Sequence, residues 1–108
     1  MERSDSFLIT DIVAGCNRII AKTENMSLTE FELDDDVQDI VFRQFGKIGE
    51  AANDLSDEFR HRYRHIKWHD IISLRNRIVH QYADINLERI WKIVREEVPN
   101  LLRQLEKL

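Results

Sequence analysis

The sequence predicts an all-α protein, an up-and-down bundle of four to five helices. Only three Gly and one Pro occur among 108 residues, and so few helix-breaking residues favour long helices with short connections. Hydrophobic residues make up 43% of the chain and charged residues 33%, which is ordinary for a charge-rich helical protein. The length suits one modest core, so we expect residues 1–108 to form a single domain.

The first helix is expected over roughly residues 5–24. Side chains that can cap a helix stand at its start, and apolar residues then recur at helical spacing. The capping candidates are Ser4, Asp5 and Ser6, and the apolar positions are Leu8, Ile12, Cys16 and Ile19. Residues 25–32 are expected to form a loop.

A second helix is expected from three consecutive aspartates to about Leu55. Acidic residues are favourable at the positive end of a helix, and we prefer this explanation to a magnesium site because no phosphate-binding motif accompanies them. Gly46 and Gly49 lie inside this helix, where each costs about 1 kcal/mol relative to Ala. They predict the close approach of another helix, within the monomer or across a dimer. The aspartates are Asp34, Asp35 and Asp36, and the apolar seam is Val37, Val41, Phe45, Ile48, Ala52 and Leu55.

A short helix is expected to begin at Ser56, with Phe59 and Tyr63 as its apolar contacts. Three histidines follow at steps of four, a spacing that resembles a metal-binding face. We expect a basic surface instead, because the helix should break over residues 66–68 and the neighbouring Arg and Lys side chains oppose a cation. The histidines are His61, His65 and His69.

Residues 68–82 predict an amphipathic helix that carries an unusual polar set. The apolar side is Ile71, Ile72, Leu74, Ile78 and Val79, and the polar set is Arg75, Asn76, His80 and Tyr82. Asn76 and His80 are four apart and share a face. Arg75 and His80 are five apart, about 140° around an ideal helix. Either the helix loosens before His80, or a second copy of the chain completes the site.

A last helix should begin at Asp84 or Asn86. Its seam has the alternating steps of four and three that are typical of helix packing. Pro99 lies inside the seam, so the helix should kink or restart there. The seam is Leu87, Trp91, Val94, Val98, Leu101 and Leu105. We expect both Trp68 and Trp91 to fill the core.

The charge distribution is uneven. Residues 60–77 hold six cations against one acid, a net charge of +5, whereas the other residues carry −9, for −4 overall. A basic band on an acidic body can hold a phosphate chain locally, although a solvated charged face is the simpler interpretation. Cys16 is the only cysteine, so no disulfide forms within the chain. No apolar run suits a membrane span and no signal peptide is visible, which favours the cytoplasm.

The stretch Arg75-Asn76-Arg77-Ile78-Val79-His80-Gln81-Tyr82 resembles the HEPN superfamily, and specifically the HepT-like toxins of two-gene toxin–antitoxin modules. Ile48-Gly49-Glu50-Ala51-Ala52, Trp68 and Ile90-Trp91 agree with the same pattern. One departure is the absence of a proline before Trp68, which concerns only the loop geometry there. The resemblance covers nearly the whole chain.

The resemblance implies a dimer whose Arg and His motifs face a shared cleft and cut RNA without a metal or other cofactor. It assigns catalysis to Arg75, Asn76 and His80, and it makes Tyr82 the acceptor of AMP from a small nucleotidyltransferase antitoxin. Neither a membrane nor DNA is an expected partner. The basic band would bind RNA through Arg60, Arg62, Arg64, Lys67 and Arg77.

Metal-free RNA cleavage needs a base for the 2′-hydroxyl, an acid for the leaving 5′-oxygen, and a cation for the phosphorane. Two copies of His80 can divide the first two roles, and Arg75 suits the third. Asn76 either orients the imidazole or binds the phosphate. Two alternatives stay open: a non-catalytic subunit that binds a nucleotide or a nucleotidyltransferase, and a plain structural dimer.

Overall fold

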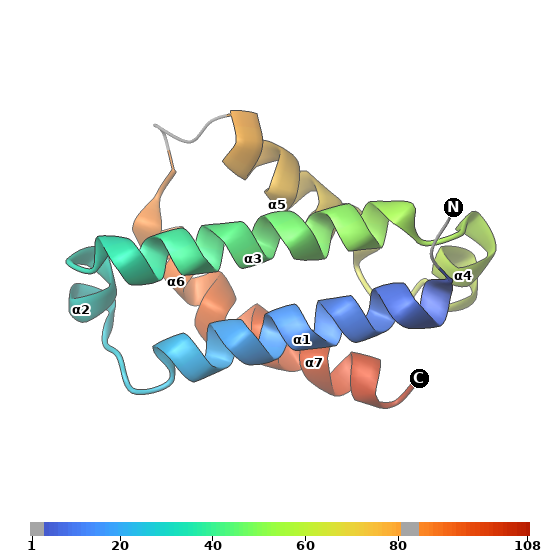
Figure 1. The fold of residues 1–108 in the computed structure, drawn as a ribbon, viewed down its shortest axis with the longest axis horizontal. Helices are drawn as coiled ribbons and strands as arrows, with labels where there is room; N and C mark the ends of the chain where they lie inside the picture. The colour runs from blue at the N-terminus through green and yellow to red at the C-terminus, as the bar shows by residue number, and fades with distance from the viewer. Residues whose placement is uncertain (1–3, 81–84) are drawn as a thin grey trace.

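The computed structural model describes residues 4–80 and 85–108, and every regular element in these two ranges is a helix. Figure 1 shows their arrangement. The elements are α1 (Asp5–Thr23), α2 (Leu28–Glu32), α3 (Asp35–Asp54), α4 (Asp57–Arg62), α5 (Trp68–His80), α6 (Leu87–Lys92), the π-helix η2 (Ile93–Glu97) and α7 (Val98–Glu106). The predicted all-α bundle is therefore confirmed.

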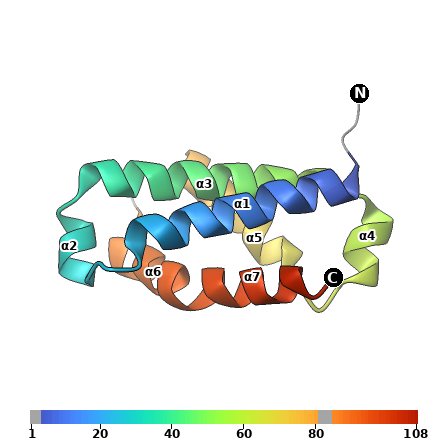
Figure 2. The same ribbon diagram turned by 60° about the horizontal axis from the view of Figure 1, so that its bottom comes forward.

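Two long helices, α1 and α3, form the centre of the bundle and run side by side in opposite directions (Figure 1). The continuous segment α6–η2–α7 lies along α1, and α5 packs almost entirely on α3 (Figures 1 and 2). The short α4 occupies one end of the long axis and α2 the other. None of the helices in the described ranges combines the length and the hydropathy that a membrane crossing needs.

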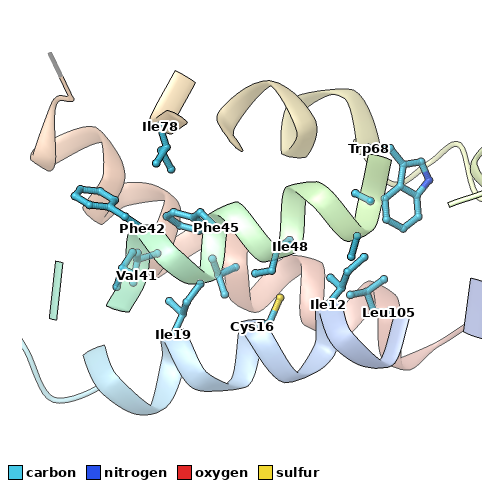
Figure 3. Packing of buried hydrophobic residues seen from close by; sticks show 14 of the residues in the cluster. Ile12, Cys16, Ile19, Val41, Phe42, Phe45, Ile48, Trp68, Ile78 and Leu105 are labelled. Carbon is cyan, nitrogen blue, oxygen red and sulfur yellow. The ribbon is translucent and has the colours of Figure 1, made fainter. Parts of the chain in front are cut away.

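The core lies where the predicted seams of α1 and α3 meet. Ile12, Cys16 and Ile19 point from α1 towards α3, which contributes Phe45 and Ile48 to the same cluster (Figure 3). Burial raises the pKa of the Cys16 thiol from 9.0 to about 12, because the thiolate would lose its hydration. Cys16 therefore stays protonated at neutral pH and acts as a small apolar residue.

Side-chain caps begin the helices at the predicted places. The backbone N–H groups of Phe7, Val37, Phe59 and Arg89 each donate to the side chain three residues earlier, at 3.0 to 3.3 Å. Each such cap stabilises its helix by about 1 kcal/mol. The capping residues are Ser4, Asp34, Ser56 and Asn86.

The predicted loop over residues 25–32 is wrong, because its second half forms the short helix α2. Ser27 caps this helix reciprocally: Glu30 N–H donates to Ser27 Oγ (3.1 Å) and Ser27 N–H donates to Glu30 Oε1 (3.0 Å). Phe31 is fully buried and stacks on Trp91, with ring centroids 5.1 Å apart. A helix of five residues is too short to show hydrophobic periodicity, so only the Ser-x-x-Glu pattern could have revealed it.

The C-terminal segment restarts near Pro99, as predicted. α6 gives way to one π-helical turn, η2, and α7 begins at Val98 with Pro99 in its first turn. Proline has no N–H and is tolerated in a first turn, so the wider turn before it lets the chain continue in nearly the same direction. Within η2, Arg95 turns towards α1 and its Nη1 donates to the carbonyl of Glu24 at 3.3 Å.

Candidate active site

The motif helix α5 is fixed at its beginning by Trp68. This side chain is only 5% exposed, and its indole N–H donates to the Tyr63 carbonyl at 3.1 Å. The ring also lies against Phe59, at 6.3 Å between centroids. The predicted core role of Trp68 is confirmed, and the bond to Tyr63 ties α5 to the turn that follows α4.

Gly49 sets the distance between α5 and α3. A methyl group on Gly49 would lie 2.8 Å from Arg75 Cγ and 3.3 Å from the Ile71 carbonyl oxygen, closer than real side chains tolerate. The predicted close approach of a helix at Gly49 is therefore confirmed, and the approaching helix is α5 itself. At Gly46 a methyl group would meet nothing within 4 Å among the described residues. The approach predicted there is not found within the monomer.

The close packing at Gly49 positions Arg75. The arginine is half-buried because its aliphatic stem lies on the glycine, and its Nη1 donates to Asn76 Oδ1 at 3.1 Å. The Asn76 amide oxygen is thus held by the neighbouring guanidinium. The Asn76 NH₂ group has no hydrogen-bond partner within residues 4–80 and 85–108, and it is exposed.

His80 is exposed and is the last residue of α5. The helix is regular up to that point, so it does not loosen before His80, and the first of the two alternatives is removed. Arg75 and His80 of one chain therefore point in different directions, about 140° apart. The completion of the site by a second copy stays a prediction. Tyr82 lies outside the described residues.

The apolar side of α5 is buried less completely than predicted. Ile78 is buried and Ile71, Ile72 and Leu74 are half-buried, but Val79 is 53% exposed. Val79 lies between Asn76 and His80 in sequence, so an uncovered apolar side chain stands beside the polar set. Periodicity alone could not show this, because Val79 is seven residues after Ile72 and therefore has the spacing of a core residue.

The predicted RNA-binding cations fall into two groups. Arg60, Arg62 and Arg64 lie in or beside α4 at one end of the bundle, and α5 runs away from that end (Figure 1). Arg60 is paired with Asp57 at 2.7 Å, and Arg64 Nη1 donates to the His61 carbonyl at 3.1 Å. Lys67 and Arg77 instead line a groove beside α5. The basic band is therefore less continuous in space than in sequence.

The three histidines at steps of four do not share a helical face. α4 ends at Arg62 and α5 begins at Trp68, so the predicted break is confirmed and His65 falls between the two helices. His69 lies in α5, with Nε2 at 3.5 Å from Ser73 Oγ. Within the described part of the chain, no group of three or more His, Cys, Asp or Glu side chains is placed to hold a metal ion.

Comparison with known proteins gives consistent matches. Residues 12–108 match the family described as Ribonuclease HepT-like. A "Putative RNase" of Methanocaldococcus jannaschii is 36% identical over 98 residues, which cover 91% of this chain and 81% of that protein. The "Probable ribonuclease HepT" of Thermococcus cleftensis is 29% identical over 108 residues, covering 100% of this chain and 98% of that protein. No solved structure matches.

Replacing Gly49 by Ala is expected to disturb α5, whereas Gly46→Ala is a matched control in the same helix. The added methyl group at position 49 collides with Arg75, so the free energy of unfolding should fall by about 1–2 kcal/mol. At position 46 the methyl group has room and Ala is the better helix former, so stability should rise by up to about 1 kcal/mol. Urea unfolding of both variants measures the difference. Equal effects at the two positions would contradict the close packing of α5 on α3.

Proposed function

This chain belongs to the Ribonuclease HepT-like family, and from that premise we propose that it is a metal-independent endoribonuclease whose site forms between two copies of α5. The observation that carries the proposal is the arrangement on this helix. A guanidinium is held on Gly49, and an imidazole and an amide are left open to the surroundings. These are the groups that cleavage of a ribose–phosphate backbone requires.

In the proposed reaction a neutral His80 takes the proton from the ribose 2′-hydroxyl, which attacks the adjacent phosphorus. The bond to the 5′-oxygen breaks, and the protonated His80 of the second copy donates a proton to that leaving oxygen. Arg75 offers forked donors to the phosphorane oxygens. The products are a 2′,3′-cyclic phosphate and a free 5′-hydroxyl, so atoms and charges balance without a further reactant.

The structure favours phosphate binding over ring orientation for Asn76. Its oxygen already accepts a bond from Arg75, so its remaining donors can reach a phosphate together with the guanidinium. A pre-formed Arg–Asn pair costs little reorganisation when the charge develops on the phosphorane. Arg60, Arg62, Arg64, Lys67 and Arg77 would attract the RNA chain, and RNA turnover agrees with a location in the cytoplasm.

The biological role we propose is that of a toxin neutralised by a small nucleotidyltransferase antitoxin. The antitoxin would transfer AMP from ATP to the hydroxyl of Tyr82, releasing pyrophosphate. Tyr82 follows His80 by two residues, so a bulky anionic group on its ring would stand beside the site. It would repel the RNA phosphates and obstruct the dimer cleft.

The first prediction is that the purified protein cleaves RNA in the presence of EDTA and that His80→Ala lowers the rate by about 10²- to 10⁴-fold, the usual loss for a general acid–base residue. The control is His61→Ala, since His61 is an exposed imidazole on α4 and should leave the rate unchanged. Single-turnover cleavage of a labelled RNA measures both variants. Full activity of His80→Ala would remove this residue from the mechanism.

The second prediction concerns the dimer. Val79 is an exposed apolar side chain within the motif. Val79→Asp should therefore place a charge in the proposed dimer interface and yield a monomer without activity. Leu33→Asp is the control, because Leu33 is 82% exposed directly after α2, outside α5. Light scattering after size exclusion gives the mass of each variant, and circular dichroism checks the fold. A dimeric, active Val79→Asp protein would defeat this interface.

The third prediction tests the modification. Incubation of the chain with its nucleotidyltransferase and ATP should increase its intact mass by one AMP unit and abolish RNA cleavage. Tyr82→Phe should prevent the mass increase, because the acceptor hydroxyl is gone, while Tyr63→Phe, at the other tyrosine of the sequence, should not. If the added mass survives in Tyr82→Phe, the acceptor is another residue. If no mass is added while inhibition occurs, the antitoxin acts by occlusion.

A further inference from the structure

A groove separates α5 from the C-terminal helical segment. It has a cavity volume of about 690 Å³, within the range of roughly 300–1,000 Å³ that small-molecule sites occupy. One wall is α5 and the other is α6, η2 and α7. The bottom is formed by Cys16 of α1 and by Phe45 and Ile48 of α3, all buried. The groove exists because α5 packs on α3 and makes few contacts with α7.

The walls of this groove combine apolar and polar groups. Leu74 of α5 and Leu101 of α7, both half-buried, line the groove from its two walls. Ser73, Asn100 and Gln104 add a hydroxyl and two amides. The amides of Asn100 and Gln104 make no hydrogen bond within the part of the chain that the structure describes. An apolar floor with a few solvent-accessible polar groups above it suits a flat, partly polar ligand such as a nucleobase.

Two arginine side chains line the groove and could bind the phosphate of a nucleotide. The two walls run in opposite directions, so the beginning of α6 and the last turns of α5 lie towards the same end of the groove (Figure 1). Arg89 in the first turn of α6 and Arg77 near the end of α5 both line the groove and are exposed. Neither forms an ion pair with another described residue. Two forked guanidinium groups at one end of an apolar groove form a suitable environment for a phosphate.

The π-turn supplies acidic groups to the same groove. Glu96 and Glu97 line it, whereas Arg95 of the same turn bonds to the end of α1. The wider turn changes which residues face α5, and π-turns are often found at functional sites. Carboxylates are unfavourable near a phosphate, but they accept hydrogen bonds from the exocyclic amino group of cytosine. With Asp70, the three acids are outnumbered by four cations on the rim, namely Lys67, Arg77, Arg89 and Arg103.

The groove runs along α5 close to the proposed active site, although His80 itself does not line it. Ser73, on its edge, is seven residues before His80, so the two side chains lie on nearly the same side of α5, about 10 Å apart along the axis. Arg77 lies between them in sequence. When the scissile phosphate of an RNA chain is at His80, the neighbouring nucleotide is therefore within reach of this groove.

We propose that the groove between α5 and α6–η2–α7 binds one nucleotide of the RNA substrate adjacent to the cleaved bond and selects a base with an exocyclic amino group. The base lies between Leu74 and Leu101 above the apolar floor, Glu96 or Glu97 accepts from its amino group, and Arg77 and Arg89 bind its phosphate. This assignment rests on the proposed ribonuclease function and adds a determinant of cleavage preference to it. Uracil, which has a carbonyl oxygen in place of the amino group, is disfavoured.

The test measures nucleotide binding separately from cleavage. His80→Ala protein is titrated with CMP or UMP and followed by two-dimensional NMR. CMP should bind about tenfold more tightly than UMP, the discrimination expected from one well-placed polar contact to a base. Arg89→Gln should weaken CMP binding roughly tenfold by removing a charge-assisted contact to phosphate. Lys92→Gln is the control, because Lys92 is an exposed cation of the same helix that does not line the groove.

A second pair of variants blocks the groove without touching the core. Asn100→Trp fills it from an exposed position on α7 and should abolish CMP binding, whereas Asn17→Trp, exposed on α1 outside the groove, should not. Both are also tested for RNA cleavage in the background with His80 intact. There Asn100→Trp should reduce the preference for the base next to the cut.

The outcomes separate this proposal from the proposed function. RNA cleavage with an unchanged preference in Asn100→Trp overturns the nucleotide groove and leaves the ribonuclease intact. Selective CMP binding without any cleavage supports the groove and overturns the ribonuclease. Equal binding of CMP and UMP overturns the selection by amino group. If Asn100→Trp alters the oligomeric mass but not nucleotide binding, the groove is a protein interface and the proposal is overturned.

Discussion

The contact between Gly49 and Arg75 is the constraint on which the candidate site depends. Because no side chain stands at position 49, α5 lies directly on α3, and the stem of Arg75 is held by the backbone of another helix. The long side chain of Arg75 therefore loses much of its conformational entropy when the protein folds. That entropy is then not lost again when substrate binds. The same contact determines where the far side of α5 stands, and so it also determines the width of the groove towards α7.

Much of the architecture could be predicted from the sequence because it follows from local chemistry. The seams of α1 and α3, the caps at Ser4, Asp34, Ser56 and Asn86, and the restart near Pro99 each depend on residues within one or two helical turns. The Gly49 contact could be predicted as a close approach, but its partner could not, because helix pairing depends on residues about 25 positions apart. α2 was missed since five residues carry no detectable period.

The residues of the candidate site could be predicted from the sequence, but their arrangement in space could be predicted only in part. The motif spacing placed Arg75 and His80 on different sides of one helix, and the regular helix up to His80 agrees with that angle. The engagement of Asn76 by Arg75 was not predictable, because neighbouring side chains on a helix seldom meet and rotamers depend on the surroundings. The exposure of Val79 and the groove depend on what α5 fails to contact, and a pattern of apolar residues does not report missing contacts.

The uneven charge has a structural basis in this arrangement. Eleven of the twenty acidic residues lie between Asp5 and Asp54, in or beside α1, α2 and α3, whereas six of the sixteen Lys and Arg residues lie within residues 60–77, around α4 and on α5. The acidic part of the surface repels a polyanion, whereas the basic part attracts it locally at one face. Binding to a phosphate chain should therefore be oriented and sensitive to salt, since surface attraction is screened within about 10 Å at 0.1 M ionic strength.

The bond from Arg95 to the carbonyl of Glu24 joins segments 71 residues apart, and α7 covers a further part of α1. A polypeptide emerging from a ribosome therefore holds α1 without its second covering until the C-terminal segment has been translated. Until then the apolar stripe of Ile12, Cys16 and Ile19 has only α3 against it. The bundle can therefore close only after α7 has been synthesised.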